Sequence, residues 1–164
     1  MTRKYSTAIA AIALVIGGIA VAYGQSRKSS LTADDYIEIQ QLYARYNMSI
    51  DAGDGEAYAA TFTPDGVFNK MAGHDALAAF VRNWHDNMKG ANMRHWNTNL
   101  AIMGTPEGAS GAVYLLLVDV SAKPPAISAA AKYEDQLVKT PAGWRFKNRV
   151  TKGEGPPPTS AAKQ

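Results

Sequence analysis

The first part of the chain carries apolar residues at the spacing of an α-helix. Thr32 followed by Asp35 is typical of a helix start, because the two side chains can each accept a hydrogen bond from the other residue's main-chain N–H. Gly53 is a natural stop for the same helix. The buried stripe of this predicted helix comprises Tyr36, Ile39, Tyr43, Tyr46 and Ile50.

Two further helical segments follow. Asp54 can cap a short helix over 55–62, whose Ala, Tyr and Phe side chains would pack inward. The stretch "TPDG" (63–66) predicts a turn, and the next residues, "VFN", predict a short strand. Residues 74–88 form a third predicted helix, with an apolar stripe made of Leu77, Phe80, Val81 and Trp84.

Beyond residue 92 the hydrophobic period changes from that of a helix to two, which indicates strands. The breaks between the strands, "TPEGAS", "KPPA" and "PAG", are rich in Pro or Gly. Three helices followed by a run of long strands predict an α+β fold, with the helices on one face of a curved antiparallel sheet. The four predicted long strands are residues 93–104, 111–122, 127–140 and 143–152.

Both ends of the chain differ from this domain, which we place at residues 32–152. Residues 1–24 combine a basic start, an apolar run and a small-residue end, which predicts a secretory signal peptide cleaved before Gln25 and a periplasmic or secreted protein. The apolar run of about 15 residues is shorter than the ~20 that span a bilayer, so an uncleaved membrane anchor is the alternative. Residues 25–31 read as a linker, and residues 153–164 as a disordered tail rich in Pro, Gly and Ala.

Composition narrows the range of partners. Loss of Arg3 and Lys4 with the leader lowers Lys plus Arg from 17 to 15 against 14 Asp plus Glu, and the chain has no basic run, which argues against nucleic acid. There is no cysteine, so packing alone must stabilise the exported domain. The three histidines lack the spacing of a metal site, and we expect neither a metal nor a cofactor.

Alternation along two strands singles out polar side chains. His95, Asn97 and Asn99 share one face with Ala101, and this polar row either lines a pocket or faces solvent. The opposite, more apolar row comprises Trp96, Thr98, Leu100 and Ile102. On the last strand, alternation places Arg149 with Arg145 and Lys147, as a solvated charged face or as a contact for an anion.

Five segments in this order resemble the SnoaL-like family of the nuclear transport factor 2-like superfamily. The resemblance covers about residues 33–152 and implies a cone, in which the sheet wraps against three helices and leaves a pocket at its open end. This fold serves dehydratases, isomerases, polyketide cyclases, dehydrohalogenases and binding modules, so the fold alone does not fix the function. The segments are "IQQLYARYNMSIDAGDGEAYAATFTPDGVF", "GHDAL", "RHWNTN", "YEDQLVK" and "GWRFKNR".

The resemblance implies roles for particular residues. In scytalone dehydratase and hexachlorocyclohexane dehydrochlorinase an aspartate near the end of the first helix orients a strand histidine that acts as general base. Asp51 and His95 match these two positions. The dehydrochlorinase also has a catalytic lysine five residues before its aspartate, where this chain has Tyr46, which argues against dehydrohalogenation.

Other polar residues are candidates for contacts with a substrate. Tyr43 or Tyr46 could donate a hydrogen bond to a developing oxyanion, as tyrosines do in the dehydratases of the family, and Arg149 could do the same. Tyr133 is a weaker candidate, because a structural role is favoured for it and for Asp135.

We therefore predict a cofactor-independent lyase or isomerase, dehydratase-like, that acts on a small, mostly apolar or aromatic molecule. The alternative is a non-catalytic module of the same fold that binds a small molecule or a protein. A weaker third reading is a structural dimerisation domain. A homodimer could form through the outer face of the sheet, where candidate contacts are Trp96, Leu116 and Val118.

Overall fold

The computed structural model describes residues 30–88 and 90–154. The predicted leader and most of both the predicted linker and the predicted tail lie outside these residues. None of the described helices is long and apolar enough to cross a membrane.

The first long helix is fixed at both ends by the residues that the sequence indicates. Thr32 accepts a hydrogen bond from the Asp35 main chain, and Asp35 accepts one from the Thr32 main chain at 2.9 Å. At the other end Gly53 adopts a left-handed conformation with φ of 71° and bonds back to the last turn. Asp54 caps the next helix through Ala57. The helices are α2 (Ala33–Ala52), α3 (Gly55–Ala59), α4 (His74–Asn87) and the 3-10 turn η1 (Gly90–Asn92).

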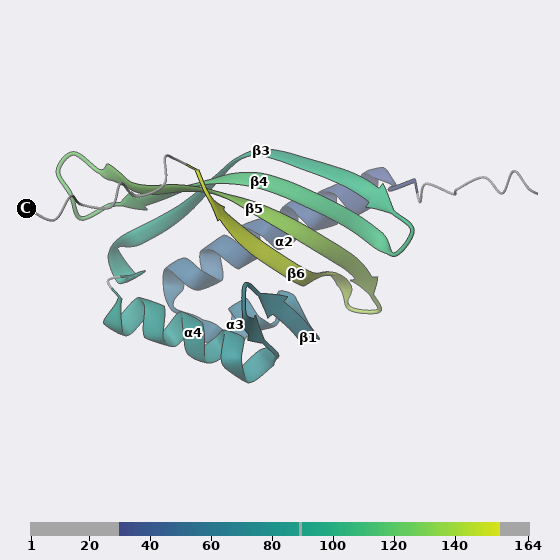
Figure 1. Ribbon diagram of the computed structural model, residues 1–164, viewed down its shortest axis with the longest axis horizontal. Coiled ribbons are helices and arrows are strands. Elements are labelled where there is room, and N and C mark those ends of the chain that lie inside the picture. Colours follow the sequence, from purple (N-terminus) through teal and green to yellow (C-terminus); the bar gives the residue numbers. More distant parts are fainter. Residues whose placement is uncertain (1–29, 89, 155–164) are drawn as a thin grey trace, which may run out of the picture.

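Six strands form one curved sheet, and the helices lie along one side of it, which confirms the predicted α+β class (Figure 1). The strand order is β2-β1-β6-β5-β4-β3. All neighbours are antiparallel except β1 and β6, which run parallel, so the sheet is mixed. The strands are β1 (Phe62–Phe68), β2 (Met71–Ala72), β3 (Met93–Thr105), β4 (Gly108–Asp119), β5 (Ala126–Thr140) and β6 (Gly143–Gly153).

The "TPDG" segment is not the turn that its sequence predicts, because it lies within β1. The register of β1 against β6 shifts between Phe62 and Val67, so the irregular segment sits inside the strand rather than between two elements.

Extra residues interrupt the alternation of the long strands. Thr98 pairs with Tyr114 and Ala101 pairs with Ala112. Two residues of β3 therefore lie between these pairs, where β4 has one, so β3 contains one extra residue. One extra residue reverses which side chains face inward. Beyond Asn99, Leu100 and Ile102 pack against the core and Ala101 is exposed, which corrects the predicted single polar row.

The same effect corrects the predicted face of Arg149. Leu137 pairs with Phe146 and Gln136 with Asn148, so β6 holds one extra residue at Lys147. Arg149 therefore faces inward and is completely buried, whereas Arg145 and Lys147 are only half-buried. The sequence-based grouping of these three residues on one face was wrong.

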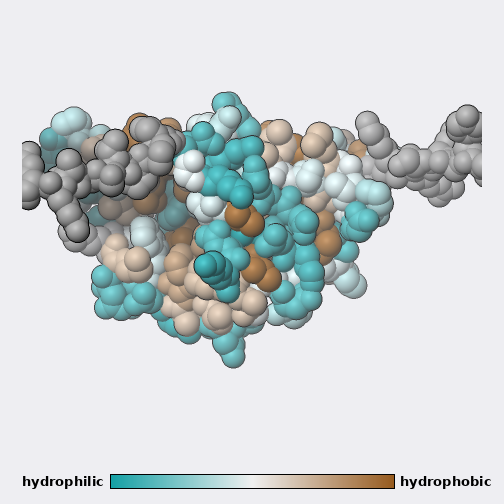
Figure 2. Space-filling model, in the orientation of Figure 1, coloured by the Kyte–Doolittle hydropathy of each residue, from teal (hydrophilic) through white to brown (hydrophobic). Residues whose placement is uncertain are grey.

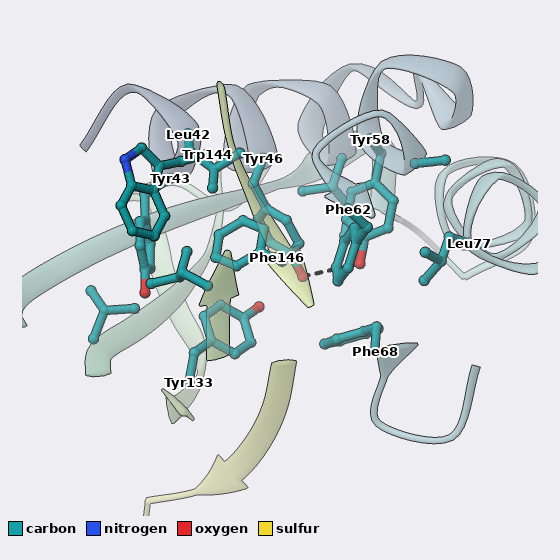
Figure 3. Close-up of a cluster of buried hydrophobic side chains, with 14 of the residues drawn as sticks. Leu42, Tyr43, Tyr46, Tyr58, Phe62, Phe68, Leu77, Tyr133, Trp144 and Phe146 are labelled. Atoms are coloured by element: carbon teal, nitrogen blue, oxygen red, sulfur yellow. Dashed lines mark hydrogen bonds between the residues drawn. The ribbon is translucent and has the colours of Figure 1, made fainter. Parts of the chain in front are cut away.

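Aromatic side chains fill the space between the sheet and the helices (Figure 3). Tyr46 lies at the centre and contacts the rings of Tyr58, Phe62, Tyr133 and Phe146 at centroid distances between 4.8 and 6.0 Å. The tyrosines of the predicted stripe are thus mostly core residues, although Tyr36 is 40% exposed.

The outer surface is more polar than this aromatic core. In the view over β6, hydrophilic residues separate small hydrophobic areas (Figure 2). Of the residues predicted for an outer dimer surface, Trp96 is 55% exposed and Leu116 is half-buried. Val118 is already buried within the single chain, so it is not available for a partner.

Candidate functional site

Asp51 and His95 meet where the last turn of α2 packs against β3. The Asp51 Oδ1 atom lies 2.6 Å from the His95 Nδ1 atom. The His95 main-chain N–H also points to this carboxylate, with distances of 3.1 and 3.2 Å to its two oxygens. Both side chains are largely shielded, with 6% of His95 and 17% of Asp51 exposed. The structure therefore brings together the two residues that the family resemblance singles out.

Neighbouring side chains hold the histidine further. Asn47, one helical turn before Asp51, donates from Nδ2 to the His95 carbonyl at 3.0 Å. The ring of Trp84, on α4, meets the imidazole edge-on with centroids 6.2 Å apart. Neither residue was predicted as part of the site, although Asn47 could have been found from its i, i+4 spacing to Asp51 on one helix face.

This arrangement suits a general base. A carboxylate that accepts from Nδ1 keeps the proton on that nitrogen, so the neutral ring presents the lone pair of Nε2. Among the described residues, none forms a hydrogen bond with Nε2. The Asp51 charge would also stabilise the imidazolium that forms when Nε2 takes a proton.

A groove of about 580 Å³ runs beside His95, between α2 and β3. It contains two of the predicted contact residues of β3, Asn97 and Asn99, and one of α2, Tyr43. Asn99 is exposed and occupies the left-handed region with φ of 57°, at the extra residue of the strand. The complete lining is Gln40, Tyr43, Ala44, Asn47, His95, Trp96, Asn97, Thr98, Asn99 and Leu100.

Arg149 lies in the core instead of this groove. Its Nε and Nη2 atoms donate to the two oxygens of Asp135 at 2.7 and 2.8 Å. Four aromatic rings surround its guanidinium at 4.0 to 4.8 Å from its central carbon, namely those of Tyr43, Tyr46, Tyr133 and Phe146. The predicted anion contact is therefore already paired with a buried carboxylate.

The predicted tyrosine donors are also engaged in the core. The Tyr58 hydroxyl donates to that of Tyr46 at 3.1 Å (Figure 3). The Tyr43 hydroxyl donates to Asp135, so Tyr43 connects the groove with the ion pair of Arg149. Burial raises the pKa of Tyr43, Tyr46 and Tyr133, so these hydroxyls keep their protons at neutral pH.

No metal site is evident in the described part of the chain, where no three His, Asp or Glu side chains cluster as ligands. His74 and His85 instead contact the acidic residues that follow them, Asp75 and Asp86, at the surface.

Known proteins resemble the chain over most of its domain. An uncharacterized protein of Mycobacterium tuberculosis is 26% identical over 132 residues, covering 77% of this chain and 90% of that protein. A Nostoc punctiforme protein of unknown function with a cystatin-like fold is 29% identical, covers 79% of this chain and 98% of its own, and superposes with a TM-score of 0.70. A Catenulispora acidiphila protein, solved in complex with S-DNPA, is 27% identical, covers 74% of this chain and 95% of its own, and has a TM-score of 0.65.

The family described as SnoaL-like domain matches residues 31–150, which include all the helices and nearly all of the sheet described above. Together with the cystatin-like fold of its structural neighbours, this match shows that the chain belongs to the SnoaL-like family of the nuclear transport factor 2-like superfamily.

Proposed function

We propose that the protein is a cofactor-independent lyase or isomerase that removes a proton from carbon in a small, mostly apolar or aromatic molecule. His95 Nε2 takes the proton, the C–H bond breaks, and its electron pair stays on the substrate as an enolate or carbanion. That electron pair then expels a leaving group such as water, or a proton returns at another carbon. In dehydration His95 donates the proton it took to the leaving hydroxyl, so the step is balanced without a co-reactant.

The observation that carries this proposal is the 2.6 Å contact between Asp51 and the Nδ1 atom of a buried histidine. Surface histidines gain little from a neighbouring carboxylate, because water screens the pair. Here the carboxylate is fixed a second time by the His95 main chain, so the ring is oriented before any substrate arrives.

The comparisons supply support of a general kind. The chain belongs to the SnoaL-like family, and a structural neighbour from Catenulispora acidiphila was solved in complex with S-DNPA. A small organic substrate for the present chain is consistent with that neighbour.

The experiment begins with the purified protein. Mass spectrometry under native conditions identifies any small molecule that it retains, and related compounds are then screened for turnover. We expect His95→Gln to lower turnover by roughly 100- to 10 000-fold, with the free energy of unfolding within about 1–2 kcal/mol of wild type. His74→Gln, which changes an exposed histidine, serves as the matched control and should keep full activity. Normal turnover by the His95 variant would refute the mechanism.

A binding module of the same fold is the second candidate. It is favoured by the engagement of Arg149 and Tyr46, since two predicted contacts for an oxyanion already have partners in the core. In that case His95→Gln would retain the co-purified molecule and no compound related to it would be converted by wild type.

We further propose that the chain is exported with its leader removed before Gln25. The mass of the mature N-terminal peptide, measured on protein recovered from the periplasm or medium, tests this. Recovery of the uncleaved chain in the membrane fraction would favour the anchor instead.

A further inference from the structure

The groove beside His95 has an uncharged lining apart from the histidine itself. It contains four amide side chains, Gln40, Asn47, Asn97 and Asn99. Tyr43 stays neutral because burial raises its pKa. A charged ligand would find no opposite charge here, so the lining favours a neutral molecule.

Asn97 is the most unusual residue of this lining. Its Oδ1 and Nδ2 atoms are both shielded from solvent, and neither has a hydrogen-bond partner among the described residues. The Oδ1 atom of Asn47, whose Nδ2 is bonded to the His95 carbonyl, is in the same situation. Buried amide groups in native proteins are nearly always paired, because an unpaired one destabilises the fold.

The position of Asn97 links it to the proposed chemistry. Asn97 lies two residues after His95, before the extra residue of β3, so both side chains point to the same side of the sheet. An amide presents one donor group and one acceptor group in a plane, which matches a hydroxyl or carbonyl oxygen on a ligand.

We propose that this groove binds a neutral molecule that carries hydroxyl or carbonyl groups, with Asn97 and Asn47 bonding its oxygen. The inference deepens the proposed function, on which it rests for the identification of the bound molecule as the substrate of His95. In the complex, the unpaired amide atoms of Asn97 and Asn47 then form hydrogen bonds with the ligand, which the described residues do not provide.

Binding of probes that carry no leaving group tests this assignment separately from turnover. The probes are 2,6-dihydroxynaphthalene and 1-tetralone, which are neutral, and 2-naphthoate, which has a similar ring and a negative charge. Their binding is followed by changes in the Asn side-chain amide resonances of nitrogen-15-labelled full-length protein. We expect at least one neutral probe to shift the Asn97 and Asn47 amides, and 2-naphthoate to bind roughly tenfold more weakly or not at all.

Two variants sharpen the test. Asn97→Leu should weaken binding of the neutral probe roughly tenfold and should raise the melting temperature, since it removes an unpaired buried amide. Asn83→Leu makes the same chemical change on the exposed face of α4 and should alter neither property.

The groove assignment would be overturned if neither neutral probe shifts these amides, if 2-naphthoate binds as well as they do, or if Asn97→Leu binds like wild type. Because binding of the probes requires no proton transfer, such a result would leave the proton-transfer proposal to be tested by the turnover of the His95 variant. Conversely, if the probes still bind to His95→Gln and this variant also turns over substrate normally, the groove assignment is supported and the mechanism is refuted.

Discussion

Asp51 holds His95 through both its ring and its main chain. One carboxylate lies 2.6 Å from the Nδ1 atom and 3.1 Å from the main-chain nitrogen of the same residue. The imidazole ring cannot turn away from α2 without breaking its contact with Asp51, and the hydrogen bond from the His95 main chain keeps the Asp51 carboxylate in place. The pair is thus a joint between the helix and the sheet as well as a candidate for catalysis.

The first prediction concerns the position of the proton on the His95 ring. With Asp51 as acceptor, the neutral imidazole should carry its proton on Nδ1, although this tautomer is the less common one for a free histidine. In Asp51→Asn the Nε2-protonated form should become populated, because the acceptor is weaker. The nitrogen-15 chemical shifts of the two ring nitrogens measure this. A ring protonated mainly on Nε2 in wild type would contradict the hydrogen bond described here.

The second prediction concerns the buried ion pair of Arg149 and Asp135. Asp135→Asn should lower the free energy of unfolding by about 3–5 kcal/mol, because it leaves a buried guanidinium without its counter-charge. Replacement of both partners, Arg149→Met with Asp135→Leu, should recover a large part of this loss. Urea unfolding of the three proteins measures the difference. If the double variant is less stable than Asp135→Asn, the unpaired charge is not the cause.

The third prediction concerns the extra residue of β3. Asn99→Val should destabilise the protein by about 1–2 kcal/mol, because a β-branched side chain resists the left-handed conformation that this position needs. Asn99→Gly should stay within about 0.5 kcal/mol of wild type, since glycine adopts this conformation freely. Thermal unfolding distinguishes the two, and equal stability of the valine and glycine variants would argue against the irregularity at Asn99.

The fourth prediction concerns the dependence of stability on pH near the start of α2. Hydrogen bonds from Lys139, the Thr32 main chain and Trp144 hold the pKa of Asp35 well below its ordinary value of 3.8. A carboxyl whose pKa is lower in the folded state contributes stability that is present above its unfolded pKa and is lost as the pH falls through its folded pKa. Wild type should therefore exceed Asp35→Asn in stability at neutral pH, and this difference should shrink below about pH 4.

Unfolding curves at several pH values provide the measurement. Glu38→Gln, at an exposed position of the same helix, is the control that should show little of this pH dependence. A difference between wild type and Asp35→Asn that stays constant down to pH 2 would show that the charge of Asp35 is not what stabilises the helix start.

Much of the architecture follows from local signals in the sequence. The capping pair at Thr32 and the glycine at its end predict α2, the Asp54 cap predicts α3, and the apolar stripe of residues 74–88 predicts α4. Alternation predicts the four long strands, and the short strand predicted at "VFN" overlaps the end of β1. The meeting of Asp51 and His95 was predictable only through the family resemblance, because residues 44 positions apart carry no local signal of contact.

The orientation of Arg149 was not predictable in this way. A single extra residue in β6 reverses the facing of every later side chain, and nothing in the composition of "WRFKNR" marks where that residue lies. The same holds for Leu100 and Ile102 on β3, whose inward orientation depends on one asparagine in a left-handed conformation. Strand pairing, a tertiary property, decides these positions.

The helix-to-strand contacts at His95 also affect how the sheet meets other chains. β3 lies at an edge of the sheet, where free main-chain groups commonly recruit strands from other molecules and start aggregation. The Asp51 carboxylate accepts a hydrogen bond from the His95 N–H, and Asn47 donates one to the His95 carbonyl. These two side chains of α2 therefore block this part of the strand edge. Substitutions that disable the dyad therefore carry a second liability: loss of Asp51 would uncover a docking point for another strand.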